Sequence, residues 1–131
     1  MNQEQMRQRT MDFAVRIVRL GAALPAGRVG DVLGKQVLRA GTSIGANYRE
    51  AIRASSRRQF ATSLEIAQRE ADETLYWLDV IGASQLVKPK RLEPIRGECD
   101  ELLSIITATI KTTKRRTTVQ QNQKSEIRNQ K

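Results

Sequence analysis

Four segments of this chain repeat apolar residues at alternating steps of three and four, and this periodicity constrains the fold more than any other feature. The spacing is that of amphipathic α-helices that pack along one face. It predicts helices over about residues 6–24, 29–53, 57–82 and from about 89–94 to 116. Proline or glycine marks the first and third breaks, and Ser55 and Ser56 stand at the second. Segment by segment, the stripes are Met6, Thr10, Phe13, Ile17, Leu20, Leu24; Leu33, Val37, Ala40, Ile44, Asn47, Ala51; Phe60, Leu64, Ala67, Ala71, Leu75, Leu78; and Leu92, Ile95, Cys99, Leu102, Ile106, Ile110.

Four helices of similar length joined by short loops favour one all-α domain, an antiparallel up-down-up-down four-helix bundle over residues 1–116. Ser56 and Gln59 have the spacing of a capping box for the third helix. Gly41 and Gly45 lie one turn apart and predict a close approach by another helix. Residues 117–131 are polar and rich in Gln and Asn, which predicts a basic, disordered C-terminal tail.

Catalytic chemistry has few candidates here. The sequence has no histidine, and its one cysteine, Cys99, falls on an apolar stripe where thiols are usually inert. Glu70 and Glu73 lack the Glu-x-x-His pairs of a di-iron bundle, so a ferritin-like metal protein is a distant alternative. We therefore expect a protein that is not an enzyme and binds no cofactor or metal.

The sequence also predicts a soluble, cytoplasmic protein without a membrane partner. The longest strongly apolar stretch without a charge, Leu102 to Ile110, is far shorter than the roughly 20 residues of a membrane span. Met1 to Arg9 is polar and unlike a signal peptide. The lone cysteine cannot form an intrachain disulfide, which fits a reducing compartment.

The net charge of +9 is concentrated near the C-terminus. Residues 111–131 hold seven Lys and Arg residues against one Glu, a net charge of +6, which leaves +3 for the other 110 residues. A second cluster spans the turn between the second and third helices. Both clusters could contact the phosphates of RNA or DNA, although a solubilising tail and a solvated helix end fit equally well. The candidate nucleic-acid-binding residues are Arg49, Arg53, Arg57, Arg58, Lys111, Lys114, Arg115 and Arg116.

A polar stripe runs beside the apolar seam of the second and third helices. If their turn centres near Ser55, antiparallel neighbours have numbers that sum to about 110, which places Arg39 against Glu70 and Glu73, and Asn47 near Ser63. We interpret the stripe as a partly buried structural layer that fixes helix register, and a binding pocket or subunit contact is the alternative. Its members are Gln36, Arg39, Ser43, Asn47, Glu50, Glu70, Glu73 and Trp77.

Two stretches carry a resemblance to a known family. The first is Gln36-Val-Leu-Arg39-Ala-Gly-Thr-Ser43-Ile-Gly-Ala-Asn47-Tyr-Arg-Glu50-Ala, and the second comprises Phe60, Ala67, Glu70-Ala-Asp-Glu73 and Tyr76-Trp77-Leu78. From about Phe13 to Ile110 the chain resembles the bacterial four-helix-bundle family, also called the 23S rRNA intervening-sequence protein family. Its opening, Met1 to Met6, and its long basic end depart from the usual pattern.

This resemblance implies an all-α bundle without assigned catalysis that assembles as a homopentamer. The accessory variability determinants of diversity-generating retroelements resemble the family in fold and bind RNA and a reverse transcriptase. The resemblance therefore implies two functions: an RNA-binding or other nucleic-acid-binding oligomer, or an accessory scaffold for a protein such as a reverse transcriptase. A fold alone does not choose between them.

Overall fold

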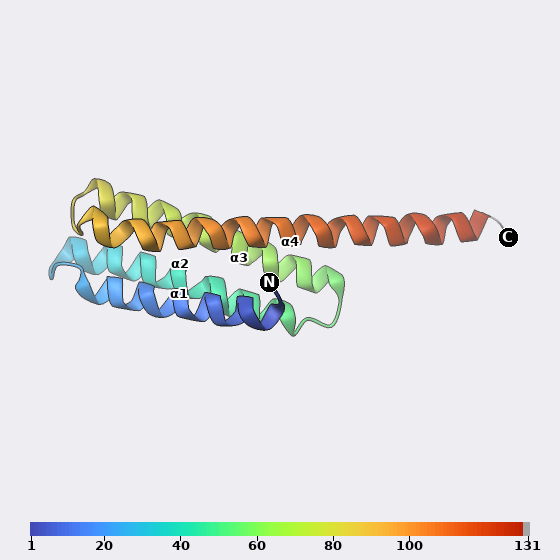
Figure 1. Ribbon diagram of the computed structural model, residues 1–131, viewed down its shortest axis with the longest axis horizontal. Helices are drawn as coiled ribbons and strands as arrows, with labels where there is room; N and C mark the ends of the chain where they lie inside the picture. Colours follow the sequence, from blue (N-terminus) through green and yellow to red (C-terminus); the bar gives the residue numbers. More distant parts are fainter. Residues whose placement is uncertain (130–131) are drawn as a thin grey trace.

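The computed structural model describes residues 1–129, which form four α-helices and no strand. They are α1 (Gln3–Ala23), α2 (Arg28–Ile52), α3 (Arg57–Ala83) and α4 (Pro89–Asn129). Figure 1 shows the chain reversing direction at each of its three loops, so that the helices lie side by side as a bundle. Each helix packs closely on the next in sequence, whereas α1 and α4 touch only lightly.

The apolar stripes form the core. All six predicted residues of α4 are buried, and Phe13, Ile17 and Leu20 on α1 are fully enclosed. The predicted stripe residues that are only partly buried are Leu24, Leu33, Asn47 and Phe60. Three of these lie near helix ends, where fewer neighbours cover a side chain. The heptad-like spacing therefore identified the buried face of every helix correctly.

Side-chain caps mark two helix starts. The Ser56 hydroxyl accepts a hydrogen bond from the backbone N–H of Gln59 at 3.1 Å, which confirms half of the predicted capping box. The Gln59 side chain instead accepts from the backbone N–H and the hydroxyl of Ser55. A complete capping box, with both bonds, is present at Asn2 and Gln5.

Glycines on α2 allow the close packing of α1. A Cβ atom at Gly41 would lie 2.8 Å from two side-chain carbons of Ile17, and one at Gly45 would lie 3.2 Å from the Thr10 hydroxyl. Ile17 would have to shift if Gly41 were alanine, and Thr10 would have to shift if Gly45 were alanine. The predicted close approach at Gly41 and Gly45 is confirmed, and α1 is the helix that approaches.

The C-terminal segment differs from its prediction. The tail expected to be disordered from residue 117 is described as helix as far as Asn129, and residues 130–131 lie outside the described part of the chain. No Gly or Pro follows Gly97, and Gln, Lys, Arg and Glu are good helix formers. Figure 1 shows that α4 continues past the end of the bundle at which the α2–α3 turn lies.

Ile110 is the last buried residue of α4, and Lys114 still pairs with Glu65 of α3 beyond it. The 19 residues from 111 to 129 correspond to about 28 Å of helix. Within residues 1–129, no helix is both long and apolar enough to cross a membrane.

Candidate nucleic-acid interface

Three arginines cluster at the turn between α2 and α3. Arg53, Arg57 and Arg58 are all exposed, and Arg53 and Arg58 line a surface groove of about 800 Å³. The first turn of α3 contains no acidic residue, although the positive end of a helix dipole favours one there. Two arginines at this position repel the helix dipole, and a bound anion would relieve that repulsion.

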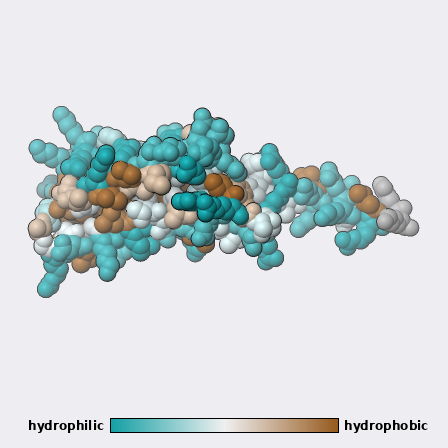
Figure 2. All heavy atoms as spheres, turned by 90° about the horizontal axis from the view of Figure 1, so that it is seen from below, coloured by the Kyte–Doolittle hydropathy of each residue, from teal (hydrophilic) through white to brown (hydrophobic). Residues whose placement is uncertain are grey.

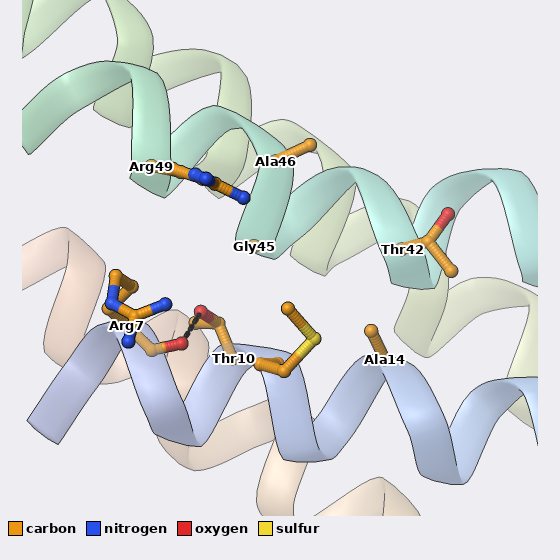
Figure 3. Close-up of a pocket in the computed structure, with 8 residues that line it drawn as sticks. Arg7, Thr10, Ala14, Thr42, Gly45, Ala46 and Arg49 are labelled. Atoms are coloured by element: carbon orange, nitrogen blue, oxygen red, sulfur yellow. Dashed lines mark hydrogen bonds between the residues drawn. The ribbon is translucent and has the colours of Figure 1, made fainter. Parts of the chain in front are cut away.

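Arg49, predicted to join this cluster, lies elsewhere. It lines a smaller groove of about 280 Å³ between α1 and α2, where Figure 3 shows it facing Arg7 across the mouth. Arg7 is paired with Glu4 at 2.7 Å, and the Thr10 hydroxyl donates to the Arg7 carbonyl oxygen at 2.9 Å. Small residues, including Ala14 and Ala46, line this groove together with Met11, so it is mainly apolar.

The basic residues of α4 divide into two groups. Lys111 and Lys114 line a groove of about 720 Å³ between α3 and α4, together with Arg69, which was not among the predicted residues. Lys114 is paired with Glu65 at 2.7 Å. Arg115 and Arg116 are exposed on the projecting part of the helix. Arg69 was missed because it stands alone in the sequence, and only the packing of α3 on α4 brings it to the lysines.

Arg39 lies between Glu70 and Glu73, as the predicted register requires. It forms an ion pair with each carboxylate, at 3.2 Å to Glu70 and closer to Glu73. The Arg39 hydrogen bond, and a second one from the Trp77 indole N–H, hold the pKa of Glu73 below its usual value. The Arg39 side chain is nonetheless 47% exposed, so the prediction of a partly buried layer is wrong for this cation.

The rest of the predicted polar stripe is partly buried, as predicted, except for Glu50. Ser43 donates to the carbonyl oxygen of Arg39 and Asn47 to that of Ser43, so both bond to their own helix; no hydrogen bond joins Asn47 to Ser63 in the described structure. Gln36 is partly buried and Glu50 is exposed. The stripe therefore lies along the α2–α3 edge.

The buried polar side chains are threonines. Thr10 and Thr74 are the two buried polar residues among those described, and each hydroxyl donates to a carbonyl oxygen of its own helix. A hydroxyl satisfied in this way can enter the core without a partner on another helix. The Arg39 guanidinium could not enter the core in this way, because a buried cation requires full pairing.

Cys99 is enclosed in the core. Its thiol lies 3.4 Å from the carbonyl oxygen of Ala71, and burial raises its pKa to about 12. A thiol with this pKa is a poor nucleophile at neutral pH. No group of three or more Cys, Asp or Glu side chains within residues 1–129 is arranged to hold a metal ion.

An exposed apolar row lies on α1. Met11, Val15 and Val18 follow steps of four and three, and each is more than 40% exposed. Figure 2 views the molecule from the side on which α1 lies in Figure 1; apolar patches gather over the bundle there, and the projecting end is mostly hydrophilic. A row of this kind is a candidate protein contact.

Comparisons with known proteins agree with this architecture. The family model described as 23S rRNA-intervening sequence protein matches residues 2–108. A crystal structure of a protein of unknown function from the S23 ribosomal protein family of Bacteroides thetaiotaomicron is 39% identical, with a TM-score of 0.79. The match covers 85% of this chain and 99% of that one. No curated protein is significantly similar to the sequence.

Proposed function

This chain belongs to the family of 23S rRNA-intervening sequence proteins, and from that membership and its charge distribution we propose that it is a non-enzymatic RNA-binding protein. The family description names an RNA context but no activity, and the structural relative is itself of unknown function. The proposal therefore depends on what this chain's own surface can bind.

The main support for RNA binding is the position of the basic residues relative to the family match. The match ends at residue 108, and the seven basic residues of 111–131 all follow it. The bundle thus carries a strongly positive helical extension at the end where Arg53, Arg57 and Arg58 are exposed. Clustered guanidinium and ammonium groups bind phosphates by releasing condensed counterions, without reading sequence.

We further propose that each subunit is an antiparallel up-down-up-down bundle and that subunits assemble as a homopentamer. The chain reversals in Figure 1 support the first point. The family resemblance and the exposed row of Met11, Val15 and Val18 support self-association. Five copies of a chain with a net charge of +9 would carry +45, which would strengthen attraction of a polyanion.

Fluorescence anisotropy with labelled RNA tests the proposed function. We expect the full chain to bind RNA with an affinity that falls steeply as salt increases. Replacing Lys111, Lys114, Arg115 and Arg116 together by Gln should weaken binding by about tenfold or more, because four phosphate contacts are lost. Truncation after Ile110 should weaken RNA binding more than assembly. Equal affinity of all three proteins for RNA would show that the extension does not contribute to RNA binding.

A second candidate function is a scaffold for a protein partner such as a reverse transcriptase. The observation that favours it is the apolar row on α1 beside the groove in Figure 3. Such binding would depend on apolar contact and would resist salt. Co-purification from the native host followed by nuclease treatment separates the two functions, because a protein complex survives the nuclease and an RNA-bridged one dissociates.

A further inference from the structure

Two basic grooves meet on α3. The groove at the α2–α3 turn and the groove between α3 and α4 are both lined by Thr62, an exposed residue of α3, so the two grooves adjoin across that helix. We call this combined surface the channel. The channel connects the turn cluster to the start of the α4 projection, two regions that are far apart in the sequence. Its basic residues are Arg53, Arg58, Arg69, Lys111 and Lys114.

The charge of the channel is not cancelled within the chain. Five basic residues face two acidic ones, Glu50 and Glu65. Lys114 is the one channel cation with an ion pair among the described residues, and its partner is Glu65. Arg69 and Lys111 therefore remain available to an external anion, as do the two arginines at the turn.

The neutral side chains of the channel indicate which part of a nucleic acid it fits. Beside the apolar Ala54, Ile66 and Ile110, they include the hydroxyl of Thr62 and the amides of Gln59 and Gln68. The Gln68 amide donates to the Thr107 hydroxyl at 3.0 Å where α3 meets α4. No described aromatic residue lines either groove. Single-stranded RNA is usually held by stacking its bases on aromatic rings, whereas an A-form duplex is held through phosphates and ribose hydroxyls.

The length of the channel also suits a backbone. Arg58 and Arg69 are eleven residues apart on α3, which is about 16 Å along the helix axis. That length reaches several successive phosphates of one strand. The contact is therefore longer than a site for a single phosphate.

We propose that this channel across α3 binds the sugar–phosphate backbone of double-stranded RNA. The inference rests on the proposed RNA-binding function and assigns it a surface and a form of RNA. Glu65 acts within it as an internal competitor, because its carboxylate occupies Lys114 at the position where a phosphate would bind.

Two triple variants of the full chain test the channel. In the first, Arg58, Arg69 and Lys111 are replaced by Gln. In the second, Arg16, Arg19 and Arg28 are replaced by Gln; these residues have no ion pair among the described residues, and the net charge falls by the same amount. We expect the channel variant to lose at least about tenfold in affinity for a short RNA duplex, with a salt slope smaller by two to three. The control variant should lose less than about threefold.

A third variant should gain affinity for the RNA duplex, a result that misfolding cannot produce. Glu65→Gln frees Lys114, so binding of the RNA duplex should strengthen by about twofold to fivefold. Circular dichroism confirms that each variant is folded.

Several outcomes would overturn the proposal that the channel binds double-stranded RNA. They are equal losses in the two triple variants, weaker duplex binding by Glu65→Gln, or single-stranded RNA binding as tightly as the duplex. If the wild-type chain binds no RNA at about 0.15 M salt, the proposed function itself fails. If the wild type binds RNA and the channel variant binds it equally well, only the assignment of binding to the channel fails.

Discussion

Arg9 on α1 donates two parallel hydrogen bonds, each 2.7 Å long, to the carboxylate of Glu98 on α4. The same guanidinium also lies 2.8 Å from Glu101. Both Arg9 and Glu98 are about four-fifths buried, and they join the two helices that otherwise touch lightly. The arginine thus closes the bundle between its first and last helices. Bidentate pairs of this kind combine strength with a fixed geometry.

Replacing Arg9 by Ala should destabilise the protein by about 1–2 kcal/mol, between the values for exposed and buried ion pairs. The physical reason is that Glu98 would keep its charge in a largely enclosed position. Urea unfolding followed by circular dichroism measures the change. Arg39→Ala is the control and should cost less, because its side chain is more than twice as exposed. A larger loss for Arg39→Ala would contradict this ranking.

The periodicity of the sequence predicted the helices and their buried faces because burial on one side repeats every three or four residues. It also gave the α2–α3 register, since a short turn leaves little freedom in which residues face each other. Arg39 accordingly meets Glu70 and Glu73. The sequence did not reveal how deeply the polar stripe of α2 and α3 is buried, because burial depends on the rotation of each helix against both of its neighbours.

Residues at helix ends were harder to place. Arg49 and Arg53 are four positions apart and were predicted in one cluster, yet they line different grooves. Four residues rotate a helix by about 40°, and Arg53 also lies beyond the end of α2. The pairing of Arg9 with Glu98 was missed for a related reason. Periodicity shows which face of a helix is apolar, but it does not show which distant helix lies beside the polar edge.

Gly41→Ala should lower the free energy of unfolding. The new methyl group would lie 2.8 Å from two carbons of Ile17, which is fully buried and cannot move aside. Overpacking of this kind costs more than the roughly 1 kcal/mol that alanine adds to helix stability, so we expect a net loss of about 1–2 kcal/mol. Thermal unfolding by calorimetry measures it.

Gly97→Ala on α4 is the matched control, because nothing lies within 4 Å of its added Cβ atom. This substitution should stabilise the protein by about 0.5–1 kcal/mol. If both alanines stabilised the protein, α1 and α2 would not pack as closely as described.

The buried thiol predicts a loss of stability in alkali. Cys99 has a pKa of about 12 in the folded chain and an ordinary pKa near 9 when unfolded, so the folded state holds the proton more tightly. Its contribution to stability is complete below about pH 9 and is lost as the pH rises toward 12. At about pH 11 the loss should reach about 3 kcal/mol.

Cys99→Ala isolates this effect from the titration of Lys and Tyr. The difference in unfolding free energy between wild type and variant should be constant near neutral pH and shift in favour of the variant above about pH 9. In the folded protein at about pH 8 the thiol should also react with a thiol reagent only as fast as the chain unfolds. Rapid labelling of the native protein would show that the thiol is accessible.

Arg58→Glu separates the stability of α3 from its binding role. Arg58 lies in the first turn of α3, after the Ser56 cap, where a carboxylate interacts favourably with the helix dipole and an arginine does not. The substitution should stabilise the fold by about 0.3–1 kcal/mol and at the same time weaken RNA binding by tenfold or more, because a phosphate contact becomes a repulsion.

Lys90→Glu is the matched control for Arg58→Glu. Lys90 lies in the first turn of α4, which also lacks an acidic residue, and Figure 1 shows that this helix begins at the opposite end of the bundle from the α2–α3 turn. It should raise the melting temperature to a similar extent with little loss of RNA affinity. Equal losses of affinity in the two variants would mean that RNA responds to net charge alone. A destabilised Arg58→Glu variant would mean that the arginine has a structural role. The opposite signs expected for stability and affinity therefore distinguish an anion-binding residue from an ordinary part of the helix.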